Sequence, residues 1–404
     1  MKPRAGSKAL IREINEALVL DVVRAHGPVA RAAITTRTGL SAATVTGIAA
    51  RLLSAGMLTE TDVVRGTGGR PARLLELGSS AVLAAGVRLS SSEVYVTLVN
   101  LRGDVVSSHR EGLSSTDPAT CADAVARAVR TATGRTRSPS LIGVGVAVSG
   151  VVDHANGVVR HSGAMGWEDV PFRARLAALL DCPVSLDSYV NCVASGLLLF
   201  DGGLAGRDLL VFSVGMSLGA SVVVQGRIHR GFEGAAGGFA HSHITGAAAG
   251  PDAGRPCHCG AVDCLETWSS YWGIQRERER RGTADRPLPD ADGDPLTGTD
   301  GELFAEAAER LGSAMANAAK LLGPERVFVA FAGEMGHAVL ASGTEREFLR
   351  QFAHGNTPVP AFEQTRADET ALARGAAYTI LARVFTTDIL EEHADETGPK
   401  PASR

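Results

Sequence analysis

The chain of 404 residues has only six cysteines, no long uninterrupted hydrophobic run and no recognisable secretion signal. Its longest apolar stretches, such as the one that begins at Leu141, are interrupted by glycine and fall short of the ~20 residues that a membrane span requires. The first residues are basic but then amphipathic and charged, without the apolar core and cleavage site of a signal peptide. We therefore expect neither a membrane protein nor a disulfide-stapled secreted one, but a cytoplasmic protein with reduced thiols.

Charge is distributed unevenly along the chain. Residues 1–77 carry 11 Lys or Arg and 6 acidic residues, a net charge of +5, whereas the remaining residues carry 29 and 38, a net charge of −9. With 45% hydrophobic residues, a chain of this length can form two or three domains. A small basic module on a large acidic body is typical of a polyanion-binding head joined to a domain with another role.

The basic segment has the pattern of three helices. Residues 10–26 place apolar side chains on one helical stripe, and a short helix over 31–37 stops at Gly39. Ser41 is a suitable N-cap for a third helix, whose apolar residues again have helical spacing. Two helices joined by a tight glycine turn have the geometry that places the second helix in the major groove of DNA.

This third helix would be the recognition helix of a winged helix-turn-helix domain spanning residues 1–78. Its outward face starts with small residues that let the backbone approach base edges, and Arg51 follows at a position suited to a phosphate. Residues 58–77 have the pattern of two strands around a glycine-rich tip, a wing whose arginines, Arg70 among them, can contact the DNA backbone or minor groove. The predicted DNA contacts are Ser41, Ala42, Ala43, Thr44, Thr46, Arg51 and Arg70. The alternative is a helical interaction module with a solvated basic face.

Residues 79–404 alternate apolar strand segments with helices, and glycine turns separate them. Near the end, a core strand over 326–335 lies between helical patterns at 302–322 and 374–384. Alternation of this kind predicts an α/β body in two lobes, with helices covering the sheets. Residues 283–301 are rich in Pro, Gly and Asp and are expected to form a mobile loop.

Half of the cysteines fall in the short stretch "CHCGAVDCLE". They are Cys257, Cys259 and Cys264. Closely spaced thiols in a reducing compartment more often bind a metal than pair with one another. The fourth ligand must come from elsewhere: His241 is the nearest upstream candidate, and His243 and His258 are its rivals. A closed Cys₃His site would hold a structural zinc that fastens a loop, and the alternative is that these are ordinary core cysteines.

The stretch "HRGFEGAAGGFAHSHI" followed by "CHCGAVDCLETWSS" resembles the signature of the ROK family, in which repressors and sugar kinases share one fold. "GVGVAVSGVVD", "SGAMGWEDVPF" and "CPVSLDSYVNCVASG" also occur in the family's order, and "GLSAATVTGIAARLLSAGML" with "GTGGRPARLLEL" resembles the head of the repressor branch. The resemblance implies an α/β protein with an N-terminal winged helix-turn-helix, followed by a two-lobed actin-like ATPase (ROK sugar kinase) fold. It also implies a zinc site, although the gap between the histidine and the first cysteine is longer here. The implied ligands are His241, Cys257, Cys259 and Cys264.

Three motifs of the family's kinases are altered in this chain. The catalytic motif N-D-x-N is matched by residues 188–191, with Tyr189 where the base stands, and losing the base alone should remove ~10² to 10⁴ in rate. Asp187 lies two residues too early to replace it. The first phosphate motif, D-x-G, is matched by residues 88–90, which read Arg-Leu-Ser, and the second has Met216 where a hydroxyl should meet phosphate. The body is therefore expected to be non-catalytic.

The sugar pocket that the resemblance implies is also incomplete. His241 and Glu266 remain, but Ser188 and Tyr189 replace an Asn and an Asp, and Gly238 replaces a Glu. Ordinary hexoses should be rejected, because each unpaired polar group costs ~1 to 3 kcal/mol. The predicted ligand contacts are His241, Glu266 and Ser188, with a brace of the zinc loop as the alternative role of Glu266. The effector is then a modified, phosphorylated or oligomeric sugar that the room at Gly238 admits, or there is none.

Together these features predict a transcriptional regulator, acting as a repressor of sugar-related genes, with a non-catalytic body and a structural Zn²⁺ in the loop around residues 241–266. The expected partners are double-stranded operator DNA, a sugar or sugar-derivative effector, and further copies of the chain in a homodimer or homotetramer; no membrane is expected. Paired heads are expected because one recognition helix reads too few base pairs. The alternatives are a ligand-independent DNA-binding regulator and an active ROK sugar kinase with an appended head.

Overall fold

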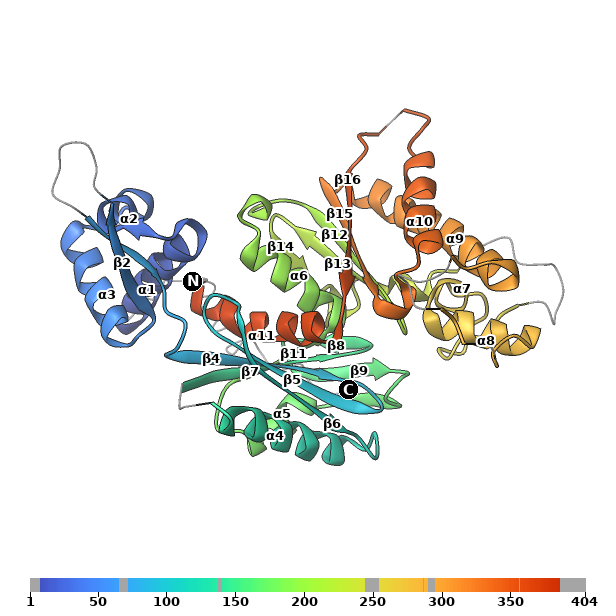
Figure 1. Ribbon diagram of the computed structural model, residues 1–404, viewed down its shortest axis with the longest axis horizontal. Helices are drawn as coiled ribbons and strands as arrows, with labels where there is room; N and C mark the ends of the chain where they lie inside the picture. The colour runs from blue at the N-terminus through green and yellow to red at the C-terminus, as the bar shows by residue number, and fades with distance from the viewer. Residues whose placement is uncertain are drawn as a thin grey trace, which may run out of the picture.

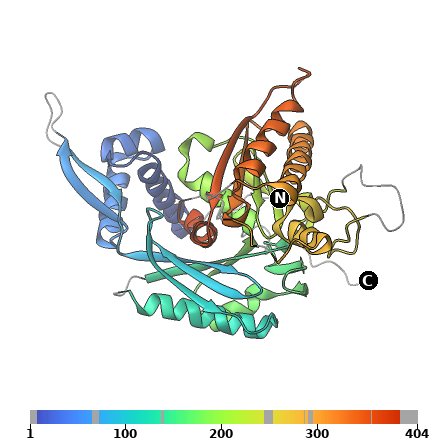
Figure 2. The same cartoon turned by 45° about the vertical axis from the view of Figure 1, so that its right-hand side comes forward.

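The computed structural model describes residues 8–64, 72–136, 140–243, 254–285, 287–289, 295–355 and 357–385 (Figures 1 and 2). A small N-terminal head precedes two lobes, each built on a five-stranded sheet. Among the described residues, no helix is both long enough and apolar enough to cross a membrane.

The head folds as the sequence predicts, with three helices and two wing strands. Its elements are α1 (Lys8–His26), β1 (Val29–Ala30), α2 (Arg31–Thr38), α3 (Ala42–Ser54), β2 (Leu58–Val64) and β3 (Ala72–Leu77). The strands pair in the order β1-β3-β2. Ser41 caps α3, because its hydroxyl accepts a hydrogen bond from the backbone N–H of Thr44 at 3.1 Å. Val45, Ile48 and Leu52 form the buried stripe of that helix. The wing tip, with Arg70, lies outside the described residues.

Lobe 1 is a sheet in the order β11-β7-β4-β5-β6, and helices cover both of its faces. Its strands are β4 (Val82–Leu89), β5 (Glu93–Val99), β6 (Val105–Gly112), β7 (Ser140–Val148) and β11 (Val184–Ser188). β4, β7 and β11 are parallel, whereas β5 and β6 are antiparallel additions. One face packs against α4 (Pro118–Gly134) and α5 (Phe172–Leu179), and the other against α11 (Glu369–Phe385). A smaller sheet contains β8 (Val151–Asp153), β9 (Val158–Ser162) and β10 (Trp167–Val170).

Lobe 2 repeats this strand arrangement, in the order β14-β13-β12-β15-β16. Its strands are β12 (Leu209–Val214), β13 (Leu218–Val224), β14 (Arg227–His229), β15 (Arg326–Ala332) and β16 (Ala361–Ala367). Again three strands are parallel and two are antiparallel additions. α9 (Gly298–Leu322) and α10 (Ala338–Arg350) cover one face, and α6 (Tyr189–Phe200) packs against the other. Two lobes with the same strand order are the actin-like architecture expected from the sequence.

The remaining elements are short and connect the strands. They are η1 (Gly202–Leu204), η2 (Phe232–Gly234), η3 (Gly238–His241), α7 (Glu266–Ser269), α8 (Tyr271–Arg281) and η4 (Gly333–Met335).

The predicted end of the loop over residues 283–301 is wrong, because α9 already begins at Gly298. The carboxylate of Asp300 in this first turn accepts a hydrogen bond at 2.9 Å from Arg278, a buried residue of α8. This charged contact fixes the first turn of the helix. Composition alone did not reveal this partner, which lies 22 positions earlier in the chain.

The hydrophobic core does not stop at residue 78, the domain boundary that the sequence suggests. One buried cluster contains Val19 and Val23 of α1 together with Leu199 of α6 and Leu381 and Phe385 of α11. Both views show α1 beside α11 (Figures 1 and 2). The boundary remains a proposal, since the head and lobe 1 share buried apolar surface.

Candidate functional site

Four side chains between η3 and α7 form a candidate metal centre. Their ligand atoms all lie within 4.8 Å of one another. They belong to His241, Cys257, Cys259 and Cys264. Of the two rival histidines, neither His243 nor His258 contributes a ligand atom to this group.

A short hairpin, residues 254–265, brings the three thiols together, and we call it the cysteine hairpin. The backbone N–H of Cys257 donates to the carbonyl of Ala261 at 2.8 Å, and Pro256 pairs with Val262. Gly260 closes the turn at φ +89°, a conformation that side chains with a Cβ rarely adopt. Cys264 pairs through its backbone with His243, which holds the hairpin against the segment that carries His241.

The group has the dimensions of a tetrahedral zinc site. The sulfurs of Cys259 and Cys264 are 3.6 Å apart, and 3.6 Å also separates the sulfur of Cys257 from Nδ1 of His241. Zn–S bonds of ~2.3 Å in a tetrahedron place two sulfurs ~3.8 Å apart. Burial raises the pKa of the Cys264 thiol to about 12, so a bound cation is needed to hold it as thiolate at neutral pH. The Cys₃His donor set therefore fits zinc.

The cysteine hairpin also touches lobe 1 through His258. Its ring lies edge-on to His241, with ring centroids 5.4 Å apart, and edge-on to Trp272 at 4.9 Å. On the other side it contacts Gly163, where an added Cβ would lie 2.6 Å from the imidazole. The hairpin thus spans from lobe 2 to the β9–β10 turn of lobe 1.

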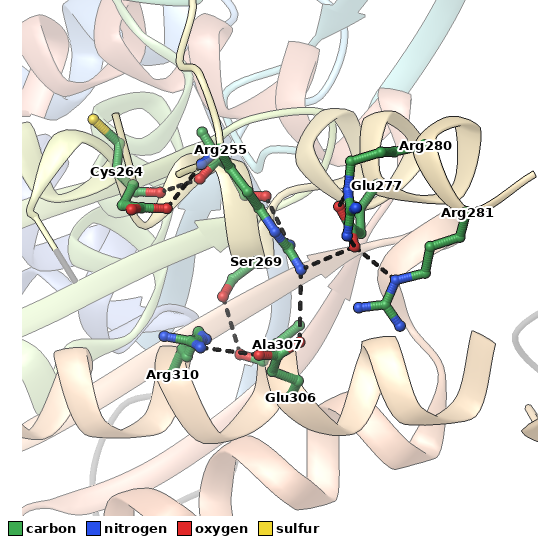
Figure 3. Close-up of polar contacts among 11 residues, drawn as sticks. Arg255, Cys264, Ser269, Glu277, Arg280, Arg281, Glu306, Ala307 and Arg310 are labelled. Carbon is green, nitrogen blue, oxygen red and sulfur yellow. Dashed lines mark hydrogen bonds and ion pairs between the residues drawn. The ribbon is translucent and has the colours of Figure 1, made fainter. Parts of the chain in front are cut away.

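Two arginines lie over the ring of Trp268, directly after the hairpin. The guanidinium carbons of Arg255 and Arg310 lie 3.5 Å and 3.6 Å from the centroid of its ring. Arg255 also pairs with Glu277 of α8 and Glu306 of α9, each at 3.6 Å (Figure 3). Stacking and ion pairing together attach the hairpin to the two helices beside it.

The side chain of Glu266 contacts the turn between β12 and β13, which contains the second phosphate motif. It is 1% exposed, and its Oε2 accepts a hydrogen bond from the backbone N–H of Leu218 at 2.8 Å. Burial raises the pKa of its carboxyl to about 8, although the Leu218 N–H lowers it. The next helix adds two contacts to the same turn, because the N–H groups of Tyr271 and Trp272 donate to the carbonyls of Gly215 and Met216. The turn that would cradle phosphate in a kinase is thus held by the segment after the cysteine hairpin.

Substitution of Glu266 should separate a bracing role from a charged role. Glu266→Ala leaves the buried Leu218 N–H without a partner and should lower the free energy of unfolding by about 2–3 kcal/mol. Glu266→Gln keeps an acceptor oxygen and should cost less than ~1 kcal/mol. Urea denaturation of both variants measures the difference. Equal destabilisation by the two substitutions would contradict the bracing role.

Tyr189, which stands where the kinases have their base, is packed between strands of lobe 1. Its hydroxyl donates to the carbonyl of Leu89, and its ring lies 5.7 Å from the guanidinium of Arg88. Burial raises the pKa of the Tyr189 phenol to about 12, so this side chain stays protonated. Arg88 in turn forms ion pairs with Glu93 and Glu369. The places of the catalytic carboxylate and of the first phosphate motif are thus occupied by side chains that bind one another.

Asp187 is equally engaged. It is 1% exposed, and its carboxylate accepts hydrogen bonds from Arg230 at 2.8 and 3.0 Å and from the amide of Asn191 at 2.7 Å. Nδ1 of His154 lies 3.4 Å from it. A carboxylate whose oxygens are already bonded to a guanidinium and an amide is poorly placed to take a proton from a substrate hydroxyl.

The three predicted ligand contacts line neither of two cavities beside lobe 2. Ser188 is the N-cap of α6, and its hydroxyl accepts from the N–H of Asn191 at 3.4 Å. Two cavities, of about 980 Å³ and 440 Å³, lie beside lobe 2, and neither is lined by Ser188, His241 or Glu266. Gly238 lines the larger one, and no atom would meet a Cβ added there. The space that the sequence suggests at Gly238 is present, but it opens to a cavity that none of the three predicted contacts lines.

The candidate DNA surface is the exposed start of α3. Ala42, Ala43 and Thr46 are exposed and Thr44 is half-buried. The hydroxyls are bonded locally, with Thr46 donating to the carbonyl of Ala42 at 2.8 Å. These side chains therefore present methyl groups and acceptor oxygens.

Two arginines of the head differ in their freedom to reach a phosphate. Arg51 donates to Glu16 of α1 at 2.7 and 3.0 Å, so a phosphate must compete with this carboxylate. Arg37, at the end of α2, is exposed and has no ion pair within the described part of the chain. The sequence pattern predicted Arg51 as the phosphate contact. It could not show the ion pair with Glu16, because that residue lies 35 positions earlier and meets Arg51 only in the folded head.

The chain is an actin-like protein with an added N-terminal head. Its two lobes have the same strand order, and a Cys₃His centre lies in lobe 2. The sequence model of the ROK family matches residues 84–383, and the chain belongs to that family. It is 25% identical over 372 residues to a xylose repressor from Caldicellulosiruptor bescii, covering 86% of this chain and 91% of that protein.

Two solved structures share the fold. A ROK family transcriptional regulator, a homologue of the Escherichia coli MLC protein, superposes with a TM-score of 0.73 at 22% identity, over 96% of this chain and 100% of that one. A ROK family glucokinase from Streptomyces griseus gives a TM-score of 0.59 at 21% identity, over 73% of this chain and 98% of that one. The regulator thus matches more of this chain than the kinase does.

Proposed function

We propose that the protein is a DNA-binding transcriptional repressor of sugar-related genes, and that its ROK body does not phosphorylate sugar. The observation that carries this proposal is the combination of an exposed helix α3 with Tyr189 and Arg88, which replace the base and the first phosphate motif of the kinases and contact each other. The similarity to a xylose repressor over 91% of that protein supports the same function.

The direct test is selection of genomic fragments by the purified protein, followed by sequencing. A repressor should enrich fragments that share a motif with two half-sites, because a dimer or tetramer presents paired heads. The genes beside them should concern sugar uptake or breakdown. Enrichment no better than that of random fragments would overturn the proposal.

A kinase is the competing function, because the fold is shared with glucokinases. We expect no sugar-dependent ADP release in a coupled assay with a panel of hexoses and acetylated hexosamines. The base is replaced by a protonated phenol, and the neighbouring Asp187 is held by Arg230. Turnover with any of these sugars, abolished by Asp187→Asn, would establish the kinase instead.

The candidate metal centre is proposed to hold a structural zinc, with His241, Cys257, Cys259 and Cys264 as its four ligands. All four positions of a tetrahedral ion are then filled by protein, so the ion stabilises the cysteine hairpin without activating water. Its effect on the rest of the protein runs through the hairpin, which touches lobe 1 at Gly163 and leads into Glu266.

A ligand-independent regulator is the second candidate, and one observation favours it. Ser188 caps a helix and Glu266 is bonded to Leu218, so two of the three predicted ligand contacts already have partners in the protein. Thermal-shift screening with sugars and sugar phosphates decides between the two, because a ligand that binds only the folded state raises the melting temperature. A sensor gives at least one concentration-dependent shift, and a ligand-independent regulator gives none.

A further inference from the structure

Helix α6 occupies a junction between both lobes and the head. Its first residues follow Asp187 and Ser188 at the end of β11 in lobe 1, and its last residues reach α1 of the head. A helix of 12 residues spans ~18 Å, so one rigid element connects these two regions.

One face of α6 is attached to lobe 2. Val190 and Ala194 are buried in one cluster with residues of the lobe 2 sheet such as Val211 and Phe328, and Leu197 packs against the same cluster. Just before the helix, Asp187 accepts two hydrogen bonds from Arg230, which follows β14 of lobe 2. A change in the arrangement of the lobes must therefore move α6 or break these contacts.

The opposite face of α6 packs closely against α11, which lies on the lobe 1 sheet. A Cβ added to Gly375 of α11 would lie 2.6 Å from the carbonyl oxygen of Cys192, and one added to Gly196 would lie 3.0 Å from the ring of Tyr378. Glycines at these points let the two helices approach at backbone distance. Such a contact transmits displacement, because close-packed interfaces resist gradual deformation.

The last turn of α6 is held by the head. Arg24 of α1 donates a hydrogen bond to the carbonyl of Leu199, pairs with Asp21 and lies 5.6 Å from the ring centroid of Phe385. Leu199 and Phe385 belong to the buried cluster that also contains Val19 and Val23 of the head. The head is therefore attached to the C-terminal ends of α6 and α11.

We infer that α6 is the element through which the arrangement of the two lobes sets the position of the DNA-binding head. Arg230 is the positioning residue at the lobe 2 end, and Arg24 is the positioning residue at the head end. The inference rests on the proposed DNA-binding function. A displacement of α6 by lobe 2 also displaces its last turn, because the helix keeps its length. The head follows, because Arg24 is bonded to that turn.

A double-mutant cycle tests this inference, because Arg24 is bonded to the last turn of α6 and Arg230 to Asp187, which lies directly before its first turn. Among the described residues, no contact joins the two arginines. Arg24→Met and Arg230→Met keep most of the apolar stem of each side chain and remove the guanidinium. Dissociation constants are measured for wild type, both single variants and the double variant, with a duplex obtained by genomic selection. Arg230→Met should change the dissociation constant at least ~5-fold when Arg24 is present and less than ~2-fold when Arg24 is replaced, since coupled sites are non-additive. Equal effects in the two backgrounds, or no effect of Arg230→Met in either, would overturn the inference.

Matched controls are Arg127→Met and Arg326→Met. Arg127 lies on α4 and Arg326 on β15, and each forms a surface ion pair, with Glu111 and Glu363. They should change the dissociation constant less than ~2-fold, singly and together. If Arg24→Met does not fold, Arg24→Lys takes its place.

A readout without DNA separates failure of the inference from failure of the proposed function. Hydrogen exchange of α1 amides should rise in Arg230→Met, and this rise should be lost when Arg24 is also replaced. A wild-type protein that prefers no duplex but shows this exchange pattern would overturn the DNA-binding function and keep the coupling. Exchange in α1 that is indifferent to Arg230 would overturn the coupling.

Discussion

Replacing Cys264 with serine is expected to remove the bound zinc and to lower the free energy of unfolding by roughly 3 kcal/mol or more. Cys264 is 2% exposed and lies at the point where the cysteine hairpin meets the His241 segment. Without the metal, the hairpin loses its four-way crosslink, and the contacts of Glu266 and Trp268 that depend on it loosen. Metal analysis of the purified variant and denaturant unfolding measure the two effects. Hydrogen exchange over residues 254–270 should increase in parallel.

Histidines two positions apart give the matched control for this prediction. His241→Ala should lose zinc, whereas His243→Ala should retain it, because only His241 places a nitrogen within the four-ligand group. Both side chains are exposed, so neither substitution leaves a large cavity. Full zinc occupancy in His241→Ala together with loss in His243→Ala would show that the assigned fourth ligand is wrong. Absence of zinc from the wild-type protein, after purification without chelators, would contradict the metal centre as a whole.

The parts of the fold that were predictable from sequence are those that local pattern controls. Ser41 caps α3 as expected, since the partner of an N-cap side chain is a backbone N–H only three residues later in the chain. The spacing of Cys257, Cys259 and Cys264 likewise predicted a shared site, because a tight hairpin brings such neighbours together whatever surrounds it. The choice of His241 among three histidines needed the family signature, since spacing alone left His243 and His258 open.

The features that sequence could not supply depend on partners distant in the chain. Arg51 was expected at a phosphate, but Glu16 lies beside it in the folded head. Tyr189 was expected only as a missing base; that its hydroxyl reaches the carbonyl of Leu89, 100 positions earlier, is a tertiary fact. The hydrogen bond from the backbone N–H of Leu218 to Glu266 is of the same kind, because the two residues lie 48 positions apart. Side-chain partners of buried polar groups are set by packing, so a one-dimensional pattern shows the need for a partner but not its identity.

An acidic substitution on the recognition helix should abolish operator binding while leaving the fold intact. Ala43 is exposed and is the second residue of α3, so Ala43→Glu places a carboxylate where the helix would enter the groove. Operator affinity is expected to fall about 100-fold, or ~2.7 kcal/mol, because a carboxylate meets the phosphates and acceptor edges of DNA. The free energy of unfolding should stay equal or rise slightly, because an acidic residue in the first turn of a helix interacts favourably with the helix dipole. Gel-shift or anisotropy titration with the selected duplex, beside thermal unfolding, measures both quantities.

The chain offers a closely matched control in lobe 1. Ala119 is also an exposed alanine at the second position of a helix, α4, with Asp117 as its N-cap. Ala119→Glu therefore changes the net charge by the same amount at the same helix position, but on a surface away from the head. It should alter operator affinity less than ~2-fold, since exposed charges beyond a Debye length are screened at physiological salt. If both substitutions weaken binding equally, the effect is one of net charge and α3 is not the surface that reads DNA. If only Ala43→Glu weakens binding, the contact lies on α3, because the net charge is matched between the two variants and thermal unfolding reports any difference in stability.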